Sequence, residues 1–259
     1  MRRHLFRGVL AAVLVGWLWS GTQADNPGKE PRKLLRRPVA LALAEKGRYL
    51  FTANQCGTVS VIDTAMSTVV GETDAGKRLS DLVATPDGET LLATDETEGT
   101  LLVLRRKGAK LEIAHRLSVG HSPVCVRPLG DGARCVVSCL WPRELQIIEL
   151  GAAPRVTRSI ALSFSPRLLL PVKDGKVVVA DAFSGHLAVV DADRGAVESD
   201  RVLPGHNIRG MALGRDGKTL LVTQQLLRDY ISTTRENVHW GNVLANNLRE
   251  LPLEAVLSP

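Results

Sequence analysis

The chain has 259 residues, a formal net charge of +6, 44% hydrophobic residues and 4% aromatic residues. Arg2, Arg3 and Arg7 lie in a leader, and a short linker over residues 25–37 carries a further excess of basic residues, so the rest of the chain is neutral by count. A basic groove of the kind that binds nucleic acid is therefore excluded, and we expect no nucleic-acid partner.

Residues 1–24 are predicted to be a cleaved signal peptide. Basic residues precede an apolar run from Gly8 to Gly21, and Thr22-Gln23-Ala24 supplies small side chains at the cleavage site, so the mature protein is expected to start near Asp25. The apolar run is shorter than the roughly 20 residues that a helix needs to span a bilayer. An uncleaved anchor is the alternative, because the run contains tryptophans, which are typical of membrane interfaces. We expect a periplasmic or extracellular protein with no stable membrane span after cleavage.

A turn ending in glycine recurs after the linker. It returns at near-constant spacing, with its glycine at Gly47, Gly88, Gly132, Gly175 and Gly217. Short apolar runs of strand-forming residues flank each glycine, so each turn is predicted to join two antiparallel strands. Four runs in each repeat, with a period of about 40–45 residues, are typical of a propeller blade.

The predicted fold is therefore all-β: a β-propeller of four-stranded antiparallel blades over residues 38–259, with the first strand of each blade innermost. Four complete repeats and a partial fifth are expected, over residues 38–79, 80–120, 121–163, 164–205 and 206–259. A polar insertion, residues 226–241, interrupts the fifth repeat. After it, either a third strand over residues 242–254 or a helix over residues 242–251 is expected. A fourth strand does not follow, which predicts a protein truncated relative to a closed ring.

The repeat residues carry a family resemblance. Residues 47–54, followed by residues 57–64, resemble the YVTN family of β-propeller repeats, and so do residues 85–92 and 215–223. The third repeat departs from the pattern, because it has Trp141-Pro142-Arg143 in place of a glycine turn. The resemblance implies an exported propeller of about six to eight blades, found in surface, periplasmic or redox-associated proteins. It implies no shared catalytic signature.

Four cysteines are expected to lie in an oxidising compartment. Cys125 and Cys135 stand five residues on either side of Gly130, so a hairpin there would place them nearly opposite each other and allow a cross-strand disulfide. The alternative is that the cysteines are small buried apolar residues. Cys135 and Cys139 lack the spacing of a zinc ribbon, and the chain has no Cys-x-x-Cys-His motif for covalent haem attachment. We predict no metal site and no cofactor.

Histidines mark the candidate binding face. His121 and His206 occupy equivalent links between successive blades, where a propeller commonly binds ligands near its central channel. Two equivalent histidines are suited to metal ligation or proton transfer, although an imidazole at such a link also serves turn hydrogen bonding. Arg209 follows His206, and the insertion adds His239 and Trp240. If the insertion folds over the channel mouth, these five residues share one face.

Two functions of different kinds fit these observations. The first is a non-enzymatic binding or interaction scaffold, whose face and insertion hold a protein partner or a neighbouring domain. The second is a redox-associated, cytochrome c-linked or lactonase-like propeller with a metal or substrate pocket at the channel mouth. Residues 206–210 and 239–242 are similar to exported bacterial propellers that continue into c-type cytochrome domains. No catalytic residue set is apparent in the sequence, which favours the scaffold over an enzyme.

Overall fold

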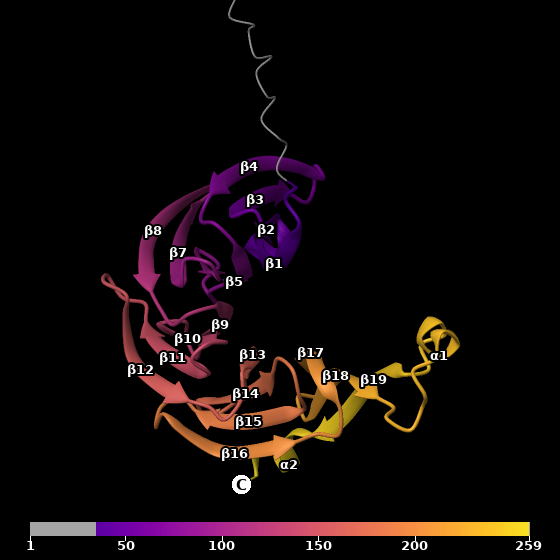
Figure 1. Cartoon of the computed structure of the whole chain (residues 1–259). Helices are drawn as coiled ribbons and strands as arrows, with labels where there is room; N and C mark the ends of the chain where they lie inside the picture. The colour runs from indigo at the N-terminus through magenta and orange to yellow at the C-terminus, as the bar shows by residue number, and fades with distance from the viewer. Residues whose placement is uncertain (1–34, 259) are drawn as a thin grey trace, which may run out of the picture. The chain divides into compact units, whose positions relative to one another are not determined.

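The computed structural model describes residues 35–258. The predicted signal peptide and most of the linker lie outside these residues, so the predictions made for them stay predictions. The described residues form five antiparallel sheets that follow one another in chain order, as Figure 1 shows. Four sheets have four strands each and the fifth has three. The all-β propeller fold predicted from the repeat is confirmed.

The strands follow the repeats closely. The first sheet contains β1 (Pro38–Ala44), β2 (Tyr49–Asn54), β3 (Thr58–Asp63) and β4 (Thr68–Asp74), with a short 3-10 turn η1 (Glu45–Gly47) after β1. The second contains β5 (Leu79–Ala84), β6 (Thr90–Asp95), β7 (Thr100–Lys107) and β8 (Lys110–Ser118). The third contains β9 (Pro123–Leu129), β10 (Arg134–Cys139), β11 (Glu144–Glu149) and β12 (Arg155–Ala161). The fourth contains β13 (Pro166–Pro171), β14 (Lys176–Asp181), β15 (His186–Asp191) and β16 (Ala196–Val202).

The fifth sheet contains β17 (His206–Leu213), β18 (Thr219–Leu227) and β19 (Leu244–Pro252). The strand interpretation after the insertion is therefore correct, and the helix over residues 242–251 is wrong, because β19 pairs with β18 along its whole length. The chain between β18 and β19 contains a short helix, α1 (Arg235–His239), and a second short helix, α2 (Leu253–Leu257), follows β19.

Turn chemistry explains where the hairpins form. The five turn glycines all have positive φ, between 64° and 90°, which side chains disfavour and glycine adopts freely. In the third repeat, Arg143 takes a φ of 69° where the first two repeats have a glycine. Asp63 and Asp191, each the last residue of a third strand, accept hydrogen bonds from backbone N–H groups two and three residues further on.

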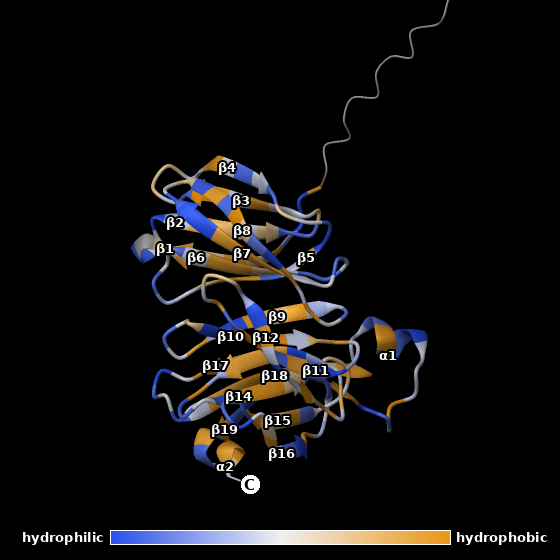
Figure 2. Cartoon of the chain, turned by 90° about the vertical axis from the view of Figure 1, so that its left-hand side faces the viewer, coloured by the Kyte–Doolittle hydropathy of each residue, from blue (hydrophilic) through white to orange (hydrophobic). Residues whose placement is uncertain are grey.

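The core is divided into layers, one between each pair of successive sheets. Four clusters of buried hydrophobic residues each draw their members from two neighbouring sheets. Within β14, Val177 and Val179 pack toward the third sheet while Val178 and Ala180 pack toward the fifth, because side chains alternate across a strand. Figure 2 shows the result: β14 and β15 are largely hydrophobic, and the outer strand β16 is largely hydrophilic.

The first strand of each sheet lies innermost, as predicted. β1 packs against β5, β5 against β9, β9 against β13, and β13 against β17. These five inner strands are therefore the elements from which a central site is built.

Candidate functional site

A β-bulge recurs at one position of the inner strands. In β1, β5, β9 and β13 one extra residue interrupts the pairing with the second strand, and in β17 the irregularity covers residues 207–209. The residues at this position are Val39, Ser80, Val124, Arg167 and Arg209. A bulge bends its strand and turns the side chain of the extra residue to a new direction. Each blade thus has one inner-strand side chain that does not pack into the hydrophobic core between neighbouring sheets.

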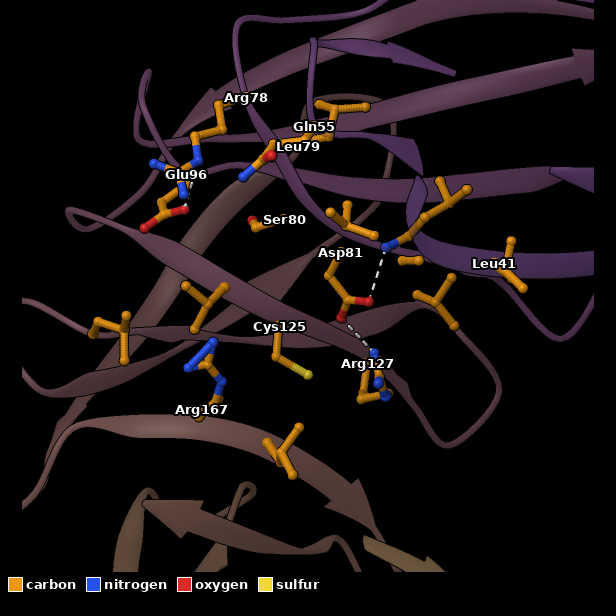
Figure 3. A pocket seen from close by; sticks show the side chains of 17 residues that line it. Leu41, Gln55, Arg78, Leu79, Ser80, Asp81, Glu96, Cys125, Arg127 and Arg167 are labelled. Carbon is orange, nitrogen blue, oxygen red and sulfur yellow. Dashed lines mark hydrogen bonds and ion pairs between the residues drawn. The ribbon is translucent and has the colours of Figure 1, made fainter. Parts of the chain in front are cut away.

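The first four bulge residues line a common cavity of about 750 Å³. The other lining residues include apolar side chains such as Leu41 and Leu168, and the polar or charged groups labelled in Figure 3. The size of the cavity is typical of a small-molecule site, and its wall combines apolar side chains with charged groups in similar measure.

A buried ion pair joins two blades beside this cavity. Asp81 in β5 accepts a hydrogen bond from Arg127 Nη1 in β9 at 2.6 Å (Figure 3). The same carboxylate oxygen accepts a hydrogen bond from the Val126 backbone N–H at 2.9 Å. The second Asp81 oxygen accepts from the Leu82 backbone N–H. The Asp81 side chain is 11% exposed and that of Arg127 31% exposed. The carboxylate is therefore committed to holding β5 and β9 together.

A second ion pair lies at the edge of the same cavity. Arg78 Nε lies 3.4 Å from Glu96 Oε2. The two acidic side chains that line the cavity, Asp81 and Glu96, are thus each paired with an arginine.

Arg167 and Arg209 have no such partner. No hydrogen bond or ion pair links either guanidinium to another residue within the range 35–258. Figure 3 shows Arg167 directed into the cavity toward Cys125. Burial lowers the pKa of Arg167 below its ordinary value, and the nearby charge of Arg209 lowers it further, while Glu96 raises it. Arg167 therefore brings a positive charge to the cavity, and the carboxylate of Glu96, which also lines the cavity, offsets this charge in part.

The structure places the two predicted link histidines at the surface. His121, in the link before β9, and His206, the first residue of β17, are both exposed. Over the described part of the chain, no group of three or more histidine, cysteine, aspartate or glutamate side chains is arranged to hold a metal ion.

The chain between β18 and β19, which we call the β18–β19 loop (residues 228–243), leaves the same end of the sheet as His206. His206 pairs with Gln225, close to the end of β18. His239 and Trp240 contact each other edge to face, with ring centroids 5.3 Å apart. Within residues 35–258, no hydrogen bond or ring contact joins either of them to His206 or Arg209. The shared face proposed for these residues stays a prediction.

The β18–β19 loop is ordered by its own polar groups. Asn237 donates to the Ser232 carbonyl and accepts from the Asn242 side chain, and its backbone carbonyl accepts from the Asn242 N–H. The Thr234 side chain caps α1 by accepting from the Asn237 N–H. The apolar side chains point outward: Tyr230 is 80% exposed, Val238 60% and Trp240 71%. None of the five residues of α1 is buried, and Figure 1 shows α1 standing clear of the strands.

The predicted disulfide is not formed. All four cysteines are free. Cys125 pairs with Ser138 and Cys135 with Pro128, so the two cysteines are not opposite each other. They also point to opposite sides of the third sheet, Cys125 toward the fourth sheet and Cys135 toward the second. Burial raises the pKa of the Cys135 and Cys139 thiols to about 12, which suits the alternative role of small buried apolar residues.

Local sequence patterns did not point to four of the bulge residues, Val39, Ser80, Val124 and Arg167, or to the Asp81–Arg127 pair. A signal for the bulges was present: each lies eight residues before its turn glycine, as 39 lies before 47, 80 before 88, 124 before 132, 167 before 175 and 209 before 217. Superposing the repeats on their glycines would have aligned these residues in one column.

The fold and this arrangement of inner strands define a β-propeller. No protein-family model matches the chain, and no curated protein matches it. Among solved structures, the chain is similar to Kuenenia stuttgartiensis hydrazine synthase, with a TM-score of 0.76 and 24% identity over 88% of this chain and 66% of that one. It is also similar to the β-propeller domain of Myceliophteria thermophila Cps50 (Swd1), with a TM-score of 0.61 and 11% identity over 83% of this chain and 72% of that one.

These similarities establish the fold. The match spans just under two thirds of the hydrazine synthase chain. No helix within residues 35–258 is long and apolar enough to cross a membrane.

Proposed function

We propose that this chain is an exported propeller of the YVTN type that acts as a non-enzymatic interaction scaffold, with the β18–β19 loop as its contact for a protein partner or a neighbouring domain. The observation that carries the proposal is the exposure of Trp240 and Tyr230 on an internally hydrogen-bonded loop. Large exposed apolar side chains that are held in place are typical of interaction sites, and tryptophan and tyrosine are the residues on which binding energy is most often concentrated.

Site-specific crosslinking in the producing cells tests this proposal. A photoreactive benzoylphenylalanine is placed at Trp240 or Tyr230, and at Trp141 as a matched control, since Trp141 is a half-exposed tryptophan in the turn of another blade. We expect one discrete adduct from both loop positions and none from position 141. Adducts from all three positions, or from none, would overturn the proposal.

The captured protein is then purified and its affinity measured. We expect Trp240→Ala to weaken binding about 30-fold, since a central aromatic contact contributes about 2 kcal/mol or more. Equal affinity for the variant and the unaltered chain would reject the loop as the contact.

Export is tested separately by N-terminal sequencing of the mature protein. We expect it to begin near Asp25, and exported material that still begins at Met1 would contradict cleavage.

A redox-associated propeller is the second candidate. The similarity to a hydrazine synthase structure and the sequence resemblance to propellers that continue into c-type cytochromes support it. This candidate predicts that the partner captured through Trp240 shows the absorption of c-type haem. The lactonase-like version instead predicts metal bound to the purified mature chain at a fixed ratio.

A further inference from the structure

The outer edge of the fifth sheet differs from the outer edges of the other four. In each of the first four sheets, the third strand pairs with a fourth strand, namely β4, β8, β12 or β16. β19 is the third strand of the fifth sheet, and within residues 35–258 it pairs with β18 alone. The other edge of β19 therefore presents unpaired backbone groups, which are a template for a further strand.

The hydrogen-bond pattern shows which residues of β19 face this edge. The Leu253 N–H donates to the Lys218 carbonyl at one end of the pairing with β18, and the Arg228 N–H donates to the Val243 carbonyl at the other end. In an antiparallel pair, residues that bond to the partner strand alternate with residues whose backbone groups point away from it. The odd-numbered residues of β19 therefore bond to β18. The even-numbered residues point their N–H and carbonyl groups to the free edge: Leu244, Asn246, Leu248 and Glu250.

Few features of β19 oppose such pairing. Natural sheet edges are commonly protected by a bulge, a proline or a very short strand. β19 runs for nine residues in unbroken register with β18, and its proline, Pro252, is the last residue. Leu248 is 58% exposed. The side chains of Asn246 and Glu250 are exposed, and neither makes a hydrogen bond or ion pair within the described part of the chain.

A second copy of β19 is complementary to this edge. If two copies pair antiparallel about a twofold axis at Leu248, this residue lies opposite its own copy, and Asn246 lies opposite Glu250 of the second copy. Directly opposite side chains lie on the same face of a sheet and in contact. The two leucines then pack together, each Asn246 amide can donate to a Glu250 carboxylate, and no like charges are opposed.

The linker of this chain suits the edge less well. Residues 25–37 contain Pro27 and Pro31, and a proline has no N–H to donate to a neighbouring strand. A second copy of β19 supplies an N–H and a carbonyl at each outward position from 246 to 250.

We propose that this chain forms a twofold-symmetric dimer in which β19 of each copy is the outer strand for the fifth sheet of the other, in the register centred on Leu248. The two three-stranded sheets then join into one continuous sheet. The dimer does not depend on the scaffold function proposed above. Capture through Trp240 tests the β18–β19 loop, whereas dimer formation tests the edge of β19.

Sedimentation equilibrium of the mature protein tests the dimer. We expect a monomer–dimer equilibrium with a dissociation constant on the order of 10 µM, because a small interface gives weak association. A protein that stays monomeric far above this concentration would overturn the proposal.

A pair of proline variants tests whether the β19 edge forms the contact. Leu248→Pro removes an outward N–H that the pairing with β18 does not use, and we expect it to weaken the dimer about tenfold or more. Val202→Pro is the matched control, because Val202 in β16 is 65% exposed. The neighbouring Leu203 N–H donates to Gly185, so the Val202 N–H also points away from its sheet. A dimer weakened by both variants, or by neither, would overturn the proposal.

Two lysine variants test the register and also cover the case in which Leu248→Pro fails to fold. Leu248→Lys places two like charges opposite each other at the twofold axis, and we expect it to weaken the dimer about fivefold or more. Asn246→Lys adds the same charge two residues away but opposite Glu250 of the second copy, so we expect the dimer to tighten about twofold to fivefold. A change in the same direction for both variants, or no change in either, would overturn the pairing centred on Leu248.

Discussion

Removing the Asp81 carboxylate should destabilise the protein more than its size suggests. In Asp81→Ala, Arg127 loses its ion pair and the Val126 backbone N–H loses an acceptor in a fully buried position. Breaking a buried ion pair from one side costs about 3–5 kcal/mol. The Arg127 side chain is 31% exposed and can regain some hydration, so we take the lower end, about 3 kcal/mol. For a domain of this size that corresponds to a fall in melting temperature of about 6–12 °C.

Urea unfolding followed by circular dichroism measures this loss. Glu112→Ala is the matched control, because it breaks the exposed ion pair between Glu112 and Lys107. The Lys107 side chain is 70% exposed and the Glu112 side chain 61% exposed. Loss of this pair should therefore cost less than about 1 kcal/mol. Asp81→Asn keeps an acceptor for the backbone N–H groups and should fall between the two. If Asp81→Ala unfolded at the same urea concentration as Glu112→Ala, the ion pair between β5 and β9 would contribute nothing, and the argument would be refuted.

Three further predictions concern turns, pH and thiols. Gly57→Ala should lower the free energy of unfolding by more than about 2 kcal/mol, because its Cβ would lie 1.9 Å from the Gly76 carbonyl oxygen. Gly217→Ala has open space around the new Cβ and should cost about 1 kcal/mol. Equal urea midpoints for the two variants would contradict the predicted clash. The N–H groups of Met66 and Arg194 contribute most to lowering the pKa values of Asp63 and Asp191 below their ordinary values. The hydrogen bonds that Asp63 and Asp191 accept therefore stabilise the folded protein above about pH 4, and this stability is lost as the pH falls through their folded-state pKa values. A urea midpoint that did not change with pH below about pH 4 would contradict this expectation. Of the four cysteines, we expect only the partly exposed Cys56 to react rapidly with a thiol reagent in the folded protein. The three buried cysteines should react only after unfolding. Rapid labelling of the folded Cys56→Ser variant would show that the buried thiols are accessible.

The architecture could be predicted from the sequence because it rests on local signals. The turn glycines and the two-residue alternation within strands such as β14 are both readable from neighbouring residues, and they specify hairpins and buried faces directly. The third strand of the fifth repeat was harder to predict, because residues 242–251 suit a helix as well as a strand, and pairing with β18 decides between them.

The site depends on information that local patterns do not contain. Cys125 and Cys135 are symmetrical about Gly130, but the hairpin pairs Leu129 with Arg134, so its centre lies between residues 131 and 132. The two cysteines are therefore out of register and on opposite faces of the sheet. Asp81 and Arg127 belong to different repeats, and only the packing of β5 against β9 brings them together. The outward direction of Trp240 follows from the hydrogen bonds around Asn237, which a polar sequence does not reveal.

The residue at the inner-strand bulge can change without disturbing the buried core. The residue at this position makes no regular pair with the second strand and is absent from the four core clusters, so its identity is not dictated by the sheets around it. The chain already uses valine, serine and arginine there. A lineage of such proteins could therefore exchange ligands by single substitutions, one blade at a time, and each change would alter the cavity chemistry while leaving the buried layers intact. This column of five residues is therefore the place where substitutions would change the inner face of the propeller at the least cost to its buried layers.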